Sequence, residues 1–566
     1  MKKTWGLFFS LVSAAAIASN CSSQPAATSG GSDAGEGGSQ PCGAAGQPCC
    51  NGAACDNGLS CSNAMCGAPM EAGGSGSGGS GGGSSSGTNS SSSGSSSGAS
   101  SGSGGSSGAG SSSGMSGSSS GVGPGPDGGP CPTGLQCNVS CSNGPTTTIS
   151  GKVYDPAGKN PLYGVTVFVP ATPLQPLPKG VPTGADACDC AALFRSGMVV
   201  STRTAADGTF SLQNAPVGSA VPLVVQVGKW RRQFSVNVTA CMDNPQPDKS
   251  LTLPSTVSQS GDSMPDIAVS TGSADTLECF FHRVGLPVTE YVAGTGTTGH
   301  VHLFSGGDPG GTGSDGRPEN PTMAGTPGSS TTLWDTAAHL MPYDVTFLSC
   351  EGGETYAANP QVLEQYVNAG GRVYAAHFHY AWFSGPLTSG QSYSAPADWG
   401  SNLATWSAAG SGLGTQSNDK IVQTLNSPSA LPFAKGQALF QWLGVVGALG
   451  VDGAPPMELP VFTPRYNAAV GTSDAPSQPW LTDDGNGDAM LFTFDTPVNA
   501  PPAPDGGAPA YCGRVAYGDV HAAGVMADTL PPPNGCASSD LSPQEKALEF
   551  MLFDLSSCVI PDSVAP

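Results

Sequence analysis

A tract made almost entirely of glycine and serine runs from residue 73 to residue 129 and divides the chain. Such a tract buries too little apolar surface to offset the entropy lost on ordering it, so we predict a disordered linker. A flexible coil of ~57 residues has a root-mean-square span of roughly 40 Å. The 566-residue chain is therefore predicted to be multidomain, with separate folded parts on either side of this linker.

The charge and the cysteine content narrow the classes of function. The formal net charge is −22, so a nucleic-acid backbone or an anionic lipid surface would repel the chain. We therefore expect no nucleic-acid partner. The chain has 18 cysteines, many of them clustered, which is typical of proteins in an oxidising compartment.

The first 21 residues have the layout of an export signal. Lys2 and Lys3 precede an apolar run that is too short for a convincing membrane span. The run ends in Ala18-Ser-Asn-Cys21, which resembles a bacterial lipoprotein signal. That resemblance implies a lipidated Cys21 as the mature N-terminus, and a protein held by a membrane at the cell envelope or outer surface. The alternative is cleavage after Ala18, which would release a soluble protein.

Residues 42–66 are predicted to form a small disulfide module. So short a segment cannot bury much apolar surface, and three disulfides would have to hold it together. The absence of histidine from this segment favours a disulfide knot over a zinc site. The pairing cannot be determined from the sequence. The cysteines concerned are Cys42, Cys49, Cys50, Cys55, Cys61 and Cys66.

Residues 131–254 are predicted to form an antiparallel β-sandwich, because short alternating strands are separated by turn residues. Asp207-Gly208 and Gly228-Lys229 each lie between two such strands and predict hairpins. Three segments resemble a carboxypeptidase regulatory-like, transthyretin-like domain: Gly151–Asp155, Gly164–Val169 and Thr204–Phe210. The resemblance implies a binding or spacer module, sometimes associated with carbohydrate, and no peptidase activity.

Residues 262–560 have a different pattern, in which short apolar strands alternate with helices. This succession predicts an α/β domain of the doubly wound, flavodoxin-like class, with a parallel sheet covered on both faces. The strands are predicted at 266–272, 300–304, 344–349 and 372–378, and the helices at 273–286, 332–343 and 359–371. A last helix is predicted from Ser542, with Glu545 completing a capping box.

Three stretches of this region resemble the class I glutamine-amidotransferase-like fold, in particular its trehalose-utilisation-like branch. They are Tyr343–Gly353, Val367–Tyr374 and Gly513–His521. The resemblance implies a nucleophilic cysteine on the sharp turn after the fourth predicted strand. Residues 375–379 hold no cysteine, and Cys350 lies one strand too early. Glutaminase chemistry needs a thiolate at that turn, so we do not expect it.

Histidines after the fourth strand are the most suggestive polar residues. In a strand, residues i and i+2 point to one face, so His377 and His379 would present two imidazoles together. Three interpretations stay open: a metal site, a metal-free polar pocket, or histidines with a structural role. We predict the last, with no bound zinc and no cofactor, and place His300 and His302 at the opposite edge of the sheet. The candidate catalytic residues are His377, His379, Asp519 and His521.

The five cysteines of the α/β region allow one free thiol. In many doubly wound folds the first and last helices share a face, so Cys279 in the first helix is predicted to pair with Cys558 after the last. Cys512 and Cys536 bracket a loop and are predicted to pair, leaving Cys350 free. Cys188 and Cys190, in an insertion of the sandwich, are expected to be linked to Cys241 or to the Cys131–Cys141 cluster.

A run from Asp484 to Asp495 has the opening spacing of a calcium loop. Ala489 stands where that loop needs glycine, and Asp495 is shorter than the usual glutamate, so we predict a simple turn between strands.

Two functions are compatible with these features. The first is a cell-surface binding or adhesion protein without catalysis, with glycans as a ligand class. The alternative is a secreted hydrolase that uses the four candidate residues of the α/β region. The missing nucleophile favours the first.

Overall fold

A computed structural model describes residues 128–142, 144–272, 274–307, 328–408, 415–474, 476–485, 487–501, 510–521 and 533–563, and the backbone of 60–62 and 65–67. The chain divides into two compact units, Met1–Ser112 and Ser113–Pro566. In the first, β1 (Ser60–Ser62) and β2 (Met65–Gly67) pair antiparallel. The predicted signal, the linker up to residue 127 and the sulfur atoms of the predicted knot lie outside the described residues.

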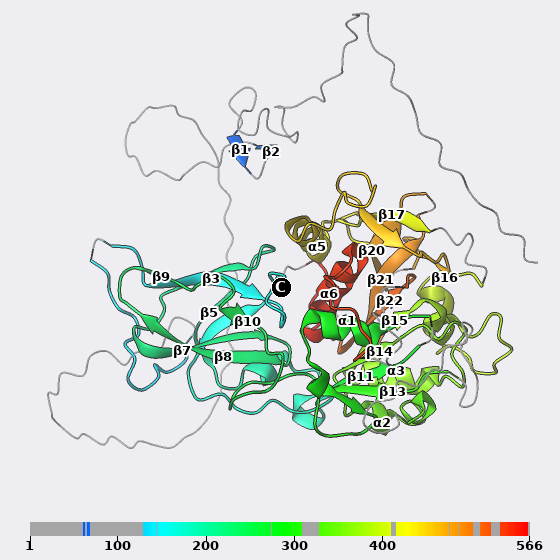
Figure 1. Cartoon of the computed structure of the whole chain (residues 1–566), viewed down its shortest axis with the longest axis horizontal. Helices are drawn as coiled ribbons and strands as arrows, with labels where there is room; N and C mark the ends of the chain where they lie inside the picture. The colour runs from blue at the N-terminus through cyan, green and yellow to red at the C-terminus, as the bar shows by residue number, and fades with distance from the viewer. Residues whose placement is uncertain are drawn as a thin grey trace, which may run out of the picture. The chain divides into compact units, whose positions relative to one another are not determined.

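Two four-stranded sheets form the first part of the second unit (Figure 1). One sheet has the order β10–β3–β6 with β9 beside β3, and the other has the order β5–β4–β7–β8. Alternate apolar side chains of both sheets, among them Ile149, Val167 and Leu223, are fully buried and belong to one core. The first sheet comprises β3 (Thr148–Tyr154), β6 (Thr209–Gln213), β9 (Asp243–Pro245) and β10 (Leu251–Thr252). The second comprises β4 (Thr166–Pro170), β5 (Met198–Arg203), β7 (Gly218–Val227) and β8 (Trp230–Val238).

One of the two predicted hairpins is present, whereas the prediction of the other is wrong. Gly228 and Lys229 connect β7 to β8, which pair antiparallel. Asp207-Gly208 makes a turn in which the Asp207 carboxylate accepts the Thr209 N–H, but β5 and β6 belong to different sheets. The bonds of that turn are local, so they reverse the chain without deciding which sheet each flanking strand joins.

A ten-stranded sheet forms the second part of this unit, in the order β12–β13–β11–β14–β15–β22–β21–β20–β17–β18. The strands from β12 to β22 are parallel to one another, and the remaining four pair antiparallel. The parallel strands are β11 (Ile267–Ser270), β12 (Tyr291–Ala293), β13 (Val301–Phe304), β14 (Val345–Leu348), β15 (Arg372–Ala376) and β22 (Gly513–Gly518).

The sheet is therefore mixed, whereas the sequence predicted a parallel one. The antiparallel strands are β17 (Gln416–Ile421), β18 (Leu459–Phe462), β20 (Ser477–Asp483) and β21 (Ala489–Thr496). They come from a region whose chain pattern has no regular alternation of strand and helix. A separate small pair is formed by β16 (Thr405–Trp406) and β19 (Ala468–Ala469).

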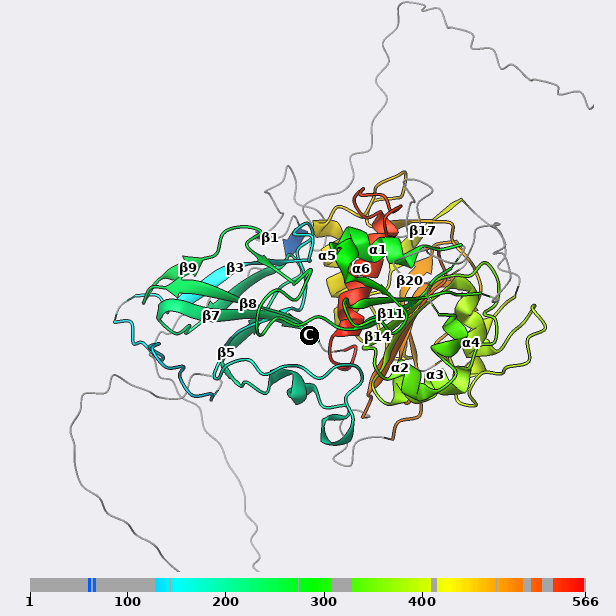
Figure 2. The ribbon, with the colours of Figure 1, turned by 60° about the horizontal axis from the view of Figure 1, so that its bottom comes forward.

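Helices cover both faces of the sheet, as Figure 2 shows. On one face lie α1 (Leu277–Val284), α5 (Ala434–Val445) and α6 (Pro543–Ser556), whose apolar residues share a core with the sandwich. On the other face lie α2 (Ala337–Leu340), α3 (Pro360–Asn368) and α4 (Tyr380–Ser384), which pack into a second core. Side chains of the parallel strands alternate between the two cores, so Val269 faces the first and Ala268 the second.

Local signals for helix ends are confirmed. Gly285, with φ of 115°, ends α1, and its N–H bonds to carbonyls of the last turn. Ser542 and Glu545 form the predicted capping box at the start of α6. The Asp484 region is the turn between β20 and β21, as predicted, and Asp495 forms an ion pair with Arg514. Among the described residues, no helix combines the length and apolar character needed to cross a membrane.

Five disulfides join the described cysteines, and the predicted pairings are wrong. Cys279 bonds to Cys536, Cys188 to Cys512 and Cys190 to Cys558. Cys131–Cys137 and Cys141–Cys241 lie within the sandwich. The insertion of the sandwich reaches across to the α/β part, so its cysteines find partners far away in sequence. The disulfides fit a protein of an oxidising, extracellular or secreted setting, and Cys350 is the free cysteine among the described residues.

Candidate functional site

The carboxyl ends of three neighbouring strands carry the polar side chains that could form a site. β14, β15 and β22 lie next to one another and run parallel. Cys350 follows β14 by two residues, His377 follows β15 directly, and Asp519 and His521 follow β22. Ligands of open α/β sheets bind at this edge. The parallel register therefore places chemically useful groups where such sheets hold their ligands.

The segment His377–His379 is a short 3-10 helix rather than the end of a strand. His377 has a φ of 37°, an uncommon left-handed conformation for a residue with a side chain, and α4 follows directly. The expectation that His377 and His379 point to one face is therefore wrong. His379 Nε2 lies 2.8 Å from the Ser349 carbonyl oxygen and its Nδ1 lies 2.6 Å from the Thr355 hydroxyl. His379 is thus a buried structural residue.

Cys350, His377 and His521 form a connected cluster. Sγ of Cys350 lies 3.4 Å from Nδ1 of His377, and the same nitrogen lies 3.1 Å from Nε2 of His521. Cys350 is fully buried, His377 is 5% exposed and His521 is half-buried. The single Nδ1 atom of His377 therefore stands between a thiol and a second imidazole.

Burial disfavours the charged form of each group in the cluster. It raises the pKa of the Cys350 thiol to about 12 and lowers the pKa of His521 to about 4. Burial also lowers the pKa of His377 to about 2, with added repulsion from His521 and Arg465. At neutral pH the cluster therefore holds a thiol and two neutral imidazoles.

Arg465 determines the tautomer of His521. Its guanidinium donates to Nδ1 of His521 at 3.2 Å. A neutral imidazole with an accepting Nδ1 carries its proton on Nε2. That N–H in turn faces Nδ1 of His377, so the hydrogen bonds run from Arg465 through His521 to His377.

Asp519 supports the backbone around the cluster. Its fully buried carboxylate accepts the N–H groups of Asn467 and Ala468 at 2.5 and 3.0 Å. Burial raises its pKa to about 7. The Tyr517 hydroxyl lies 3.0 Å from this carboxyl group and donates to the His377 carbonyl at 2.8 Å. Asp519 therefore positions the chain around His377, and its hydrogen bonds do not go to an imidazole.

The other histidine pair lies away from this cluster. His300 Nδ1 is 2.6 Å from Glu290, and His302 Nδ1 is 2.9 Å from the Gly294 carbonyl oxygen. Both flank or enter β13 near its beginning, at the amino edge of the parallel strands. The prediction that His300 and His302 lie at the opposite edge is confirmed.

Three residues of the site escaped the sequence analysis. Tyr517 lies within the Gly513–His521 stretch that carries the family resemblance, but nothing in the sequence marks its hydroxyl as a link between two other groups. Arg465 and Asn467 come from the irregular segment between β18 and β19. No spacing or motif connects that segment to His521, which lies more than fifty residues further along the chain.

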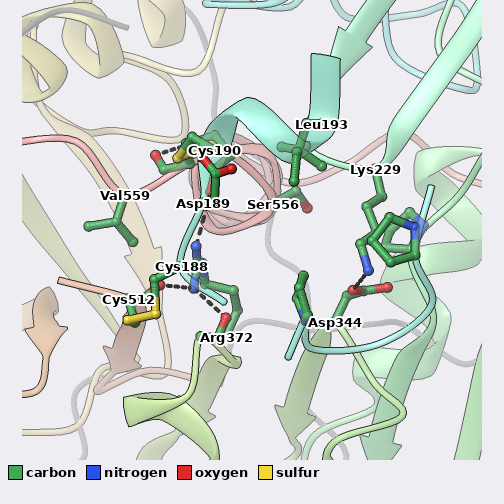
Figure 3. A pocket seen from close by; sticks show the side chains of 18 of the residues that line it. Cys188, Asp189, Cys190, Leu193, Lys229, Asp344, Arg372, Cys512, Ser556 and Val559 are labelled. Carbon is green, nitrogen blue, oxygen red and sulfur yellow. Dashed lines mark hydrogen bonds and ion pairs between the residues drawn. A yellow bond between two sulfur atoms is a disulfide. The ribbon is translucent and has the colours of Figure 1, made fainter. Parts of the chain in front are cut away.

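A cavity of about 120 Å³ lies elsewhere, where the sandwich meets the amino edge of the parallel strands. Figure 3 shows Lys229 paired with Asp344 there, and the Cys188–Cys512 disulfide beside it. The Cys190–Cys558 disulfide also lines this cavity. Arg372 donates to the Cys512 and Leu555 carbonyl oxygens at 2.6 and 3.1 Å. Because its charged groups bond to one another and to the backbone, we interpret this cavity as part of a cross-linked junction.

No protein-family model and no curated protein matches the chain. Among solved structures, a type II cohesin–X-dockerin complex from Acetivibrio cellulolyticus, a C-terminal interface mutant, is similar at 15% identity. The match covers 27% of this chain and 79% of that chain, with a TM-score of 0.13. A likeness at that score supports no conclusion about fold or function.

Proposed function

We propose that this protein is an exported cell-surface binding protein, held to a membrane by an acylated Cys21, that binds a glycan and does not hydrolyse it. In this proposal the parallel half of the large sheet is a flavodoxin-like, amidotransferase-like domain without glutaminase activity. The strand order β13–β11–β14–β15–β22, with helices on both faces, supports that assignment.

One observation supports the absence of glutaminase chemistry in this domain. A strand, a residue with left-handed backbone and a helix follow one another at β15, His377 and α4. This is the turn at which the resemblance implies a nucleophilic cysteine. His377 occupies it, and the nearby Cys350 is fully buried, so a substrate carbonyl cannot reach its sulfur.

The sandwich offers a place for a glycan. A shallow depression of about 350 Å³ lies over β3 and β6, with Lys152, Gln246 and Asp248 among its polar lining residues. Gly151 lines its floor, and a side chain there would press on Gln246 and Phe210. Amide, ammonium and carboxylate groups around a shallow surface can hydrogen-bond sugar hydroxyls.

Glycan-array binding by the mature chain tests this function. Lys152→Ala and Gln246→Ala should each weaken binding to the best glycan at least about tenfold, roughly 1.4 kcal/mol. Gln213→Ala, an exposed glutamine of β6 outside the depression, is the matched control and should bind normally. Absence of glycan binding by the wild-type chain, or equal binding by all variants, would contradict the proposal.

The anchor is tested separately by intact mass spectrometry of the exported protein. We expect an acylated Cys21 as its first residue. A free N-terminus at Ser19 would refute the anchor and leave the binding proposal untouched.

A secreted hydrolase is the second candidate, because His377 and His521 meet at the carboxyl edge of the sheet with Asp519 close by. Hydrolysis of chromogenic glycosides or esters that is lost in His521→Gln, with the fold retained by circular dichroism, would favour this candidate over the binding protein.

A further inference from the structure

Three potential metal ligands from three different loops meet at the carboxyl edge of the parallel strands. Cys350, His377 and His521 each offer one ligand atom, and these atoms lie within 4.8 Å of one another. They follow β14, β15 and β22, which are adjacent in the sheet. Three neighbouring strand ends therefore bring these ligand atoms together.

The spacing of the ligand atoms matches a tetrahedral metal. With metal–sulfur bonds of about 2.3 Å and metal–nitrogen bonds of about 2.0–2.1 Å, the S···N and N···N edges of a tetrahedron are about 3.5 and 3.3 Å. Two of the three corresponding distances here are close to these values, at 3.4 Å from Cys350 to His377 and 3.1 Å from His377 to His521. The third, from Cys350 to His521, is at most 4.8 Å, so His521 and Cys350 would have to move closer together around an ion.

The sequence predicted no bound zinc, but this geometry leads us to a different inference: we propose that Cys350 Sγ, His377 Nδ1 and His521 Nε2 bind one zinc-class divalent transition-metal ion. A thiolate with two imidazoles suits Zn²⁺ and disfavours Mg²⁺ and Ca²⁺, which prefer oxygen. Binding forms a metal–sulfur bond and releases the thiol proton to solvent. The three residues leave a fourth position for a water or an external ligand, as in open zinc sites.

The surroundings of His377 are suited to a histidine that coordinates a metal ion. The Tyr517 hydroxyl donates to its carbonyl at 2.8 Å and holds the turn that carries it. A ring bound through Nδ1 carries its proton on Nε2 and needs an acceptor for it. Asn467 lies beside His377 and is 1% exposed. Its amide nitrogen donates to the Ser407 carbonyl oxygen at 2.7 Å, so its buried amide oxygen is left as the acceptor beside His377.

Arg465 opposes binding in the metal-free protein. Ligation through Nε2 places the His521 proton on Nδ1, towards which the guanidinium donates. Arg465 is only half-buried, so its side chain can turn to solvent when an ion binds. The site should therefore gain affinity when this cation is removed. The inference goes beyond the proposed function and does not depend on it, since glycan binding involves the sandwich.

Cobalt titration of the chelator-treated mature chain tests the site, because the absorption spectrum of bound Co²⁺ depends on which atoms coordinate the ion. We expect one equivalent to bind, with visible bands of a tetrahedral ion and a near-ultraviolet sulfur-to-cobalt band, all reversed by Zn²⁺. X-ray absorption of the zinc-loaded wild type should show one sulfur and two imidazole ligands. This measurement needs no variant and holds even where substitutions unfold the chain.

Variants assign the ligands. Cys350→Ser should lose the sulfur-to-cobalt band, and His521→Gln should weaken Zn²⁺ binding by more than the about 10–100-fold typical of outer-shell changes. Arg465→Met should tighten binding. His339→Asn, which removes an exposed histidine, is the control for adventitious binding and should change nothing.

Three results would overturn the site: no cobalt bands in the wild type, an absorption spectrum without sulfur, or a band retained by Cys350→Ser. Weaker binding in Arg465→Met would also contradict it. None of these results bears on the glycan assay, so the two proposals fail separately.

Discussion

Glu278 shows how strongly one buried residue can make stability depend on pH. It lies in the first turn of α1 and is 2% exposed. Burial raises the pKa of its carboxyl group from 4.5 to about 7, so the folded protein favours the neutral form. A raised pKa gives stability that is fully present below the unfolded pKa and is lost as pH rises through about 7. The loss is about 3 kcal/mol by pH 8.

Glu278→Gln keeps the shape and stays neutral, so its melting temperature should fall less than that of the wild type between pH 5 and pH 8. Asp155 and Asp419 are also buried with raised pKa values, about 6 and about 7, so a smaller slope should remain. Asp452→Asn, at an exposed position, is the control and should leave the slope unchanged. Identical pH profiles for Glu278→Gln and wild type would contradict the assignment.

At the scale of an element, the position of α6 depends on hydrogen bonds in its first turn. The Ser542 hydroxyl accepts the Glu545 N–H at 3.3 Å, and the Glu545 carboxylate accepts the Ser542 N–H at 2.7 Å. The helix that follows packs against both parts of the second unit: Phe553 meets Trp230 of the sandwich, and Phe550 meets Trp442 of α5. The cap therefore positions a helix on which two cores depend.

Ser542→Ala should lower the free energy of unfolding by about 1 kcal/mol, because it leaves a backbone N–H without its acceptor. Thermal or denaturant unfolding measures the change. Ser539→Ala, an exposed serine three residues earlier, should have no measurable effect. Equal stability of the two variants would show that water replaces the cap.

At the scale of the whole molecule, two disulfides tie the sandwich insertion to the α/β part. Cys188–Cys512 and Cys190–Cys558 span 324 and 368 residues of sequence. Cross-links over long loops restrict the unfolded chain most in the chain-entropy account. The same junction also contains the buried ion pair of Lys229 with Asp344.

Replacing Cys188 and Cys512 together by serine should cost about 2–4 kcal/mol and uncouple the unfolding of the two parts. Replacing Cys131 and Cys137, which are only six residues apart, should cost less. Calorimetry of both double variants distinguishes the effects.

Non-reducing peptide mapping should recover the five disulfides, and a thiol reagent should label Cys350 after denaturation. Cys350 found in a disulfide would contradict the structure.

The sequence by itself determined the features that rest on neighbouring residues. Gly285 ends α1 because glycine adopts the left-handed conformation readily, and Ser542 with Glu545 starts α6 through bonds within one turn. Gly228 likewise places the β7–β8 hairpin. The alternation of strand and helix indicated the parallel half of the large sheet, since each strand is a buried apolar run between polar loops.

Only the tertiary structure decided what depends on distant partners. The Asp207 turn could not reveal that β5 and β6 join different sheets, and cysteine spacing could not reveal that Cys188 meets Cys512. His377 was expected in a strand, but the left-handed turn aims its ring at Cys350 and His521. Local patterns record the conformation of one segment, whereas a site assembled from three loops depends on sheet register and packing.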